Sequence, residues 1–174
     1  MSVDPRPVPI ELRHMTAADA APISRAFLAM GQVRSEWQFL DYVAEREVGI
    51  REAWVATWNG ALAGIVTLHW NPLYAGIAGR GIPEIQDLMV LLEYRRRGVA
   101  TRLLDLAEHA ASTRAHHVAI GVGLHPGYNA AQRLYVLRGY VPDGLGVTYD
   151  DRYVEEGEML RFDDLLVLHL IKSL

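Results

Sequence analysis

Cysteine is absent from the chain. Its absence excludes disulfide bonds, thiolate metal ligands and a cysteine nucleophile together. Basic side chains are limited as well, because Lys172 is the only lysine and the formal net charge is −4. A nucleic-acid partner is therefore disfavoured, since a polyanion needs a basic surface, although a local patch could still bind one.

Long apolar runs are also missing. No stretch approaches the ~18 apolar residues that a membrane span needs, and residues 1–14 lack the apolar core of a signal peptide. The seven histidines follow no metal-ligand spacing such as H-x-x-x-H. We therefore expect a cytoplasmic protein with no membrane partner and no metal.

The remaining composition is that of a globular protein, with 51% hydrophobic and 22% charged residues over 174 positions. This length favours one domain. We expect residues 1–7, which belong to a proline-containing stretch, to form a flexible lead-in. Residues 8–174 are expected to form the domain itself.

Apolar periodicity predicts the order strand, helix, helix, three strands, helix, strand, helix and two final strands. Asn59-Gly60 between two apolar stretches is the preferred pair for a type I′ hairpin turn. Strand–helix–strand in the middle implies a parallel pair with a crossover, whereas the hairpin and the C-terminal pair should be antiparallel. The fold class is therefore α/β (α+β), a mixed sheet flanked by helices. Residues 165–174 either complete this sheet or contribute to a homodimer, and a dimer is our expectation.

An arginine-rich turn follows the long strand at residues 82–92, and a helix begins directly after it. The first backbone N–H groups of a helix lack acceptors within the helix, and the helix dipole is positive there, so an anion binds well. A dinucleotide fingerprint would need three glycines and a P-loop would need a lysine, but this turn has only Gly98. The other interpretation of the turn by itself is a solvated arginine cluster with one glycine.

Two motifs resemble the signatures of the GNAT superfamily of N-acetyltransferases. Arg95-x-x-Gly98-x-Ala100 is similar to the first, Q/R-x-x-G-x-G/A, and "NAAQRLY" at 129–135 is similar to the second, N-x-x-A-x-x-L-Y. The element order fits as well. The resemblance covers roughly residues 8–174, and it implies a mostly antiparallel sheet whose central parallel strands splay apart.

The resemblance implies acetyl-CoA as co-substrate. It assigns the pyrophosphate to the signature turn and the pantetheine arm to the backbone of the long strand, with a further coenzyme contact from the second signature. The implied coenzyme-binding residues are Leu88, Met89, Val90, Arg95, Arg96, Arg97, Gly98, Val99, Ala100, Thr101 and Asn129. A backbone N–H near Met89 or Val90 would stabilise the oxyanion formed when an amine attacks. Asn129 could otherwise cap its helix.

The resemblance also implies two catalytic roles. Tyr135 would be the general acid that protonates the departing thiolate, although it could instead be a core tyrosine on an amphipathic helix. The usual base position falls on Gln86, which cannot accept a proton. Glu84 is the candidate base, because residues 84 and 86 share one strand face. Asp87 would point to the other face unless a bulge intervenes, and His125 is a second candidate base.

The acceptor is expected to be the primary amine of a small molecule. Residues 143–164 carry eight acidic and two basic side chains, a balance of −6, which would attract a cation or could merely be a solvated loop. Four aromatic residues could line the acceptor pocket or belong to the core: Trp37, Phe39, Trp70 and Tyr74. The alternatives are a protein N-terminal or lysine acetyltransferase, and a catalytically silent acyl-CoA-binding module, which Gln86 favours.

Overall fold

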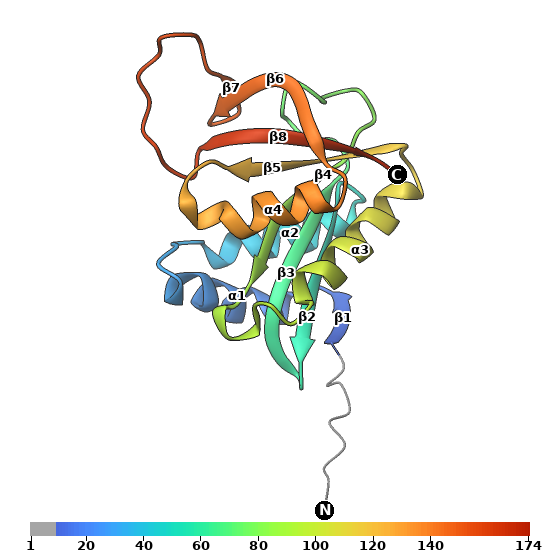
Figure 1. Cartoon of the computed structure of the whole chain (residues 1–174). Helices are drawn as coiled ribbons and strands as arrows, with labels where there is room; N and C mark the ends of the chain where they lie inside the picture. The colour runs from blue at the N-terminus through green and yellow to red at the C-terminus, as the bar shows by residue number, and fades with distance from the viewer. Residues whose placement is uncertain (1–9) are drawn as a thin grey trace, which may run out of the picture. The chain divides into compact units, whose positions relative to one another are not determined.

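The computed structural model describes residues 10–174, so the expected lead-in at 1–7 lies outside the described residues. The elements follow in the order β1 (Ile10–His14), α1 (Ala17–Ala29), α2 (Glu36–Glu47), β2 (Arg51–Trp58), β3 (Ala61–His69), β4 (Glu84–Val90), α3 (Val99–Ser112), β5 (His117–Gly123), α4 (Asn129–Leu137), β6 (Val141–Tyr149), β7 (Arg152–Tyr153) and β8 (Leu166–Ser173) (Figure 1). This order confirms the predicted one, except that the short β7 was not expected.

The strands are hydrogen-bonded in the order β1-β2-β3-β4-β5-β8-β6-β7. Most pairs are antiparallel, and β4 with β5 is the parallel pair, joined at Glu84↔Ala119 and Ile85↔Ile120. The predicted mixed fold class is confirmed. Chain contacts define two compact units: the first unit contains residues up to Leu68 and Asp87–Ala107, and the second contains His69–Gln86 and Glu108–Leu174. Strand β4 contributes to both units and passes from one to the other between Gln86 and Asp87.

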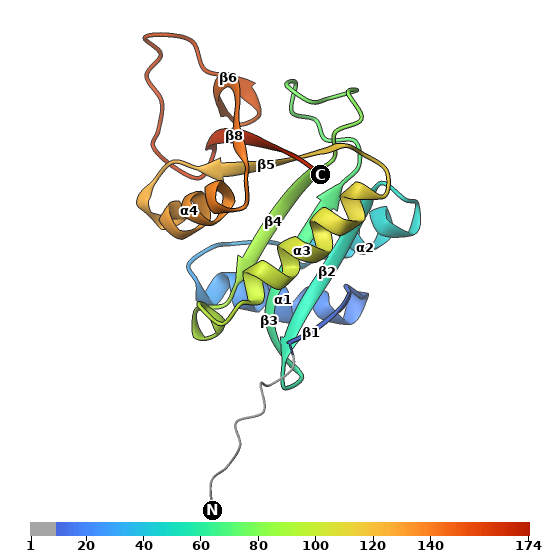
Figure 2. The same ribbon diagram turned by 45° about the vertical axis from the view of Figure 1, so that its right-hand side comes forward.

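In the first unit, helices cover both faces of the strands (Figure 2). Helices α1 and α2 bury Phe27 and Phe39 in one core with Val55 of β2 and Ile65 of β3. Gly64, the neighbour of Ile65, faces α3 instead, since a Cβ at Gly64 would lie 3.2 Å from Leu103 and 3.3 Å from Val99. Consecutive β3 residues therefore face the helices on opposite sides of the sheet, as strand geometry requires.

Local sequence chemistry begins and ends several elements, and it confirms the predicted Asn59-Gly60 turn. Thr16 precedes α1, and its backbone N–H donates to Asp19 Oδ2 (2.8 Å), one half of a capping box. Asn59 and Gly60 have φ of 50° and 77°, as a type I′ turn requires. Gly139 follows α4 with φ of 88°, the left-handed conformation that ends helices.

The second unit is built on β5 and β8, which pair over seven residues from His117↔Ser173 to Gly123↔Val167. Strand β8 also pairs with β6, so residues 165–174 complete the protein's own sheet, one of the two predicted alternatives. The register of β6 shifts between Pro142 and Val147. The loop at residues 70–83 packs Tyr74, Ile77 and Ile82 against this sheet.

Candidate functional site

The signature turn leads into α3 with backbone N–H groups that lack backbone acceptors. Arg96 and Gly98 both have positive φ, 60° and 82°, and α3 begins at the next residue. The first α3 bond runs from the Arg102 N–H to Gly98 O (3.0 Å). Within residues 10–174, no backbone acceptor is found for the amides of Val99, Ala100 and Thr101. These amides lie at the helix start, where the sequence predicts that an anion binds.

Two of the three arginines in the turn are held by neighbouring groups. Arg95 donates from Nε to Val90 O (3.1 Å), so it ties the turn back to the end of β4. The Arg97 guanidinium lies over the Trp58 ring, 5.2 Å from its centroid. Arg96 is exposed and has the left-handed backbone. The turn therefore carries three positive charges next to the helix start, and Arg95 ties it to the end of β4.

The last residues of β4 lie in the first unit beside β3. Met89 is buried in the core of α1 and α2, whereas Leu88 and Val90 are half-buried. A Cβ at Gly64 would approach Met89 O to 2.5 Å, so only glycine allows β3 to lie this close to β4. The backbone of residues 88–90 is thus held rigidly, which any backbone contact to a ligand requires.

Asp87 breaks the regular geometry of β4. Its φ of 51° is the left-handed conformation, rare for a non-glycine residue within a strand. The Tyr42 hydroxyl of α2 donates to Asp87 Oδ2 (2.5 Å) and accepts from Gln38 Nε2 (2.6 Å). Burial, and then the negative Asp87, raise the pKa of Tyr42. The strand is therefore irregular at Asp87, and its carboxylate faces Tyr42.

Glu84 lies at the start of β4 in the second unit, and only 5% of its surface is exposed. Gln86 donates from Nε2 to Glu84 Oε2 (2.7 Å), which confirms that the two side chains share one strand face. Glu84 is therefore a buried carboxylate and not a solvated group at the start of the strand. The carboxylate instead stands one hydrogen bond away from the position at which GNAT enzymes often keep their base.

His169 is the second neighbour of Glu84, with Nε2 at 3.4 Å from Oε1. Glu84 pairs with Ala119 and His169 with Gly121, so the two side chains meet across small residues on one face of β5. His169 is 3% exposed, and its Nδ1 has no hydrogen-bond partner in the described chain. Tyr74 stacks on the imidazole with a centroid separation of 3.6 Å. No sequence pattern predicts His169 at this place, because its position depends on the β5–β8 register.

Tyr135 lies on α4, with 5% of its surface exposed. Burial raises the pKa of Tyr135, with Tyr128 as a smaller electrostatic cause, so the phenol keeps its proton at neutral pH. In residues 10–174 no hydrogen bond to the Tyr135 hydroxyl is found. Gln132 donates from Nε2 to Gly123 O (2.9 Å), which fixes α4 to the end of β5.

The remaining predicted site residues have different surroundings. Asn129 is exposed at the first position of α4, and its side chain does not act as the cap, because Tyr128 occupies that position. His125 uses both ring nitrogens: Nδ1 accepts from the Gly127 N–H (3.1 Å), and Nε2 contacts Asp164 (2.7 Å). His125 is thus a structural residue at the start of α4, and this geometry disfavours it as a free base.

The predicted aromatic residues and the acidic residues of 143–164 differ in their surroundings. Phe39 is fully buried in the core, Trp37 is mostly exposed, and Tyr74 donates to Asp143 Oδ2 (2.5 Å).

Four of the eight acidic residues have hydrogen-bond or ion-pair partners: Asp143, Glu158, Asp163 and Asp164. The other four are exposed and make no side-chain hydrogen bond or ion pair inside the described range: Asp150, Asp151, Glu155 and Glu156. The balance of −6 is unchanged by these contacts, because it already counts Arg152 and Arg161, but four of the carboxylates are held by neighbouring groups.

Two further kinds of feature are absent from residues 10–174. No helix in that range combines the length and apolar character that crossing a membrane requires. No three His, Asp or Glu side chains of the same range gather so that they could hold a metal ion.

The family model "Acetyltransferase (GNAT) family" matches residues 22–140. The chain therefore belongs to the GNAT acetyltransferase family. No curated protein sequence matches it significantly.

Solved structures share the fold at low sequence identity. An N-acetyltransferase from Staphylococcus aureus Mu50 superposes with a TM-score of 0.71 and 15% identity, over 95% of this chain and 98% of that one. A Salmonella typhimurium acetyltransferase that modifies the N-terminal serine of ribosomal protein L7/L12 gives 0.70 and 13%, over 96% and 98%. The protein yncA from Salmonella typhimurium, solved with its cofactor acetyl-CoA, gives 0.68 and 19%, over 94% and 93%.

Proposed function

We propose that residues 8–174 act as one N-acetyltransferase domain that transfers an acetyl group from acetyl-CoA to a primary amine. The observation that carries this proposal is the turn at 95–101, where a family signature coincides with helix-start amides that have no backbone acceptor and with two left-handed residues. Phosphate oxygens suit such a site, because amide donors and the helix dipole both favour negative charge.

The coenzyme contacts are proposed along the first unit. The amides of residues 96–101 hold the pyrophosphate, with charge from Arg95, Arg96 and Arg97. The backbone of Leu88, Met89 and Val90 holds the pantetheine arm, and Asn129 of the second unit adds a polar contact. A backbone N–H at Met89 or Val90 stabilises negative charge on the thioester oxygen. The Gly64 contact supports this assignment, because it fixes the strand that carries the donor.

The proton chemistry is assigned to the second unit. Acetyl-CoA supplies the thioester that a neutral amine attacks directly, without a covalent enzyme intermediate. Tyr135 holds the proton that the departing thiolate requires. Glu84 accepts the proton from the amine, with Gln86 as the polar group between the carboxylate and the acceptor. The Gln86–Glu84 hydrogen bond favours an active enzyme over a silent acyl-CoA-binding module, because it places a carboxylate that can accept a proton next to the glutamine.

Replacing Tyr135 with Phe tests the acid role. We expect turnover to fall at least about tenfold, roughly 1.4 kcal/mol in activation free energy, because the thiolate loses its proton donor. Acetyl-CoA affinity, measured separately by calorimetry, should stay unchanged.

Tyr140→Phe is the matched control, since Tyr140 is also a buried phenol of the second unit but donates to Glu108 (3.1 Å). Turnover of Tyr140→Phe should remain close to the wild-type value. Equal turnover of Tyr135→Phe and wild type would rule out the acid role.

The acceptor is proposed to be a small and preferably cationic amine, given the four exposed acidic residues at 150–156. A protein N-terminal amine is the second candidate, because solved structures of this fold include a ribosomal-protein-alanine N-acetyltransferase from Brucella melitensis. A turnover panel of amines, polyamines, amino acids, aminoglycosides and peptide N-termini separates the two. Preference for uncharged acceptors or for peptides would overturn the small-cation assignment.

A further inference from the structure

A surface groove of about 440 Å³ lies in the second unit, within the size range of small-molecule sites. Its lining comes from three places in the chain: the loop before β4, the segment between α3 and β5, and the end of β8. Six of its lining residues are Arg80, Ile82, Arg114, His116, His117 and Ile171. No acidic side chain belongs to this lining, all of which falls inside the described range.

The two arginines are positioned by neighbours that leave most of their donors available. Arg80 donates from one guanidinium nitrogen to Gly76 O (2.7 Å). The Arg114 guanidinium lies on the face of Trp70, 4.2 Å from the ring centroid. Neither arginine forms an ion pair with any residue between 10 and 174. Both are thus partly preorganised, and a planar fork of N–H donors suits the oxygens of a phosphate or carboxylate.

Arg114 is also not needed to complete the end of α3. The last carbonyls of a helix require donors from outside the helix. The hydroxyls of Ser112 and Thr113 donate to His109 O and Ala110 O (2.7 Å each). The Arg114 and Ala115 amides both donate to Ala111 O, at 3.0 and 2.9 Å. The Arg114 side chain therefore has no capping role and remains available to the groove.

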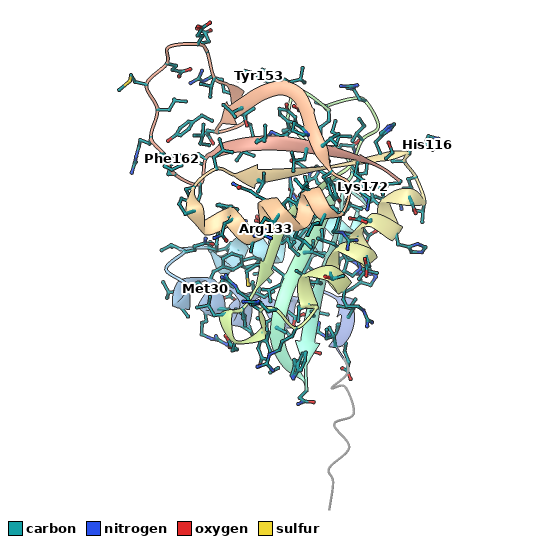
Figure 3. The ribbon with its side chains drawn as sticks, viewed as in Figure 1. Met30, His116, Arg133, Tyr153, Phe162 and Lys172 are labelled. Atoms are coloured by element: carbon teal, nitrogen blue, oxygen red, sulfur yellow. The ribbon has the colours of Figure 1, made fainter. Side chains whose placement is uncertain are left out.

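The two histidines add donors on another side of the groove. His116 precedes β5, and His117 is the first β5 residue, so strand alternation does not separate them. Figure 3 shows His116 at the chain segment that joins α3 to β5. An imidazole donates from at least one ring nitrogen in either charge state. Ile82 and Ile171 supply apolar surface in the same groove.

We propose that this groove binds a small organic anion, in which a phosphate or carboxylate is attached to an apolar or aromatic group. Arg80, Arg114 and the two histidines bind the charged group, and Ile82 and Ile171 contact the apolar part. This site is separate from the acetyl-CoA site proposed above, whose anion-binding turn is at residues 95–101. It does not depend on catalytic activity, so the two proposals can fail independently.

The probes are phenyl phosphate, benzoate, inorganic phosphate and the uncharged benzyl alcohol. Trp70 supplies the readout, because an anion on Arg114 should change the fluorescence of the stacked indole. We expect saturable binding of phenyl phosphate or benzoate, by fluorescence and by calorimetry, and none of benzyl alcohol. The Trp70→Phe protein should lose most of the fluorescence change. A stronger response to phenyl phosphate than to benzoate would define the group as phosphate, and the reverse would define it as carboxylate.

The variants locate the site. Arg114→Ala and Arg80→Ala should each weaken binding at least about tenfold, because each removes charge-assisted hydrogen bonds to the anion. Arg133→Ala is the matched control, since Arg133 is an exposed arginine of α4 outside the groove (Figure 3). Binding that coenzyme A displaces, or that Arg114→Ala leaves unchanged, overturns the proposal. Binding of polyglutamate but of none of the small anions also overturns it, in favour of an acidic protein partner.

Discussion

Two buried glutamates of the second unit differ in how completely they are paired. Glu108, at the end of α3, is 8% exposed, and Glu84, at the start of β4, is 5% exposed. Glu108 accepts from Arg138 Nη2 (2.8 Å), Lys172 Nζ (2.6 Å) and the Tyr140 hydroxyl (3.1 Å). Among the described residues, Glu84 has only the neutral Gln86 amide at 2.7 Å and the more distant His169 at 3.4 Å.

This difference supports a structural role for Glu108 and the proposed proton-transfer role for Glu84. Burying a charge is costly unless opposite charges and hydrogen bonds compensate it. Arg138 and Lys172 do so for Glu108, and they join α4 and β8 to the end of α3. Glu84 lacks a permanently charged partner inside the described chain, and the nearby His169 Nδ1 has no partner there either. Incompletely satisfied titratable groups of this kind are concentrated at functional sites.

The largest effect is expected from Glu108→Ala. This change leaves Arg138 and Lys172 without their shared carboxylate, and breaking a buried pair in this way costs about 3–5 kcal/mol. Chemical denaturation of both proteins at neutral pH measures the difference in unfolding free energy.

His109→Ala, at the adjacent exposed position of α3, is the control and should change stability by less than about 0.5 kcal/mol. If Glu108→Ala is no less stable than His109→Ala, Glu108 does not hold these elements together. Turnover per folded molecule should be preserved in both variants.

The sequence was sufficient for features that depend on local chemistry. The element order follows from apolar periodicity, and the 59–60 turn follows from Asn-Gly, which tolerates two positive φ values. The Gly98 turn was likewise predictable, because a helix start and a glycine adjoin in the sequence. The Glu84–His169 pair was not, because it requires two strand registers and the missing side chain of Gly121. The ion pairs of Glu108 join residues 30 and 64 positions away, which no local pattern encodes.

An intermediate effect, on turnover and not on folding, is expected from Glu84→Gln. The amide keeps the volume and the hydrogen-bonding capacity of the side chain but cannot accept the amine proton. We expect turnover with a primary amine to fall at least about tenfold, or roughly 1.4 kcal/mol in activation free energy.

The pH profile separates a chemical role from a positional one. The acid limb of the wild-type turnover profile should disappear in Glu84→Gln, while the affinity for acetyl-CoA stays the same. A parallel profile with reduced amplitude would instead indicate that Glu84 only positions Gln86. Unchanged turnover would show that water or another group removes the proton.

The smallest effect is expected in the acid stability of the wild-type protein compared with Glu108→Gln. Burial alone would raise the pKa of Glu108, but the hydrogen bonds from Arg138 and Lys172 outweigh it and lower that pKa. A carboxyl whose pKa is lower in the folded state stabilises the protein fully above its unfolded pKa of ~4.3. That contribution is lost as the pH falls through the folded pKa. The stability difference between wild type and Glu108→Gln should therefore be constant from pH 6 to 8 and should shrink below about pH 4. Denaturation curves at half-unit pH steps measure it, and a difference that persists unchanged to pH 2 would mean that Glu108 does not bind its partners as a charged group.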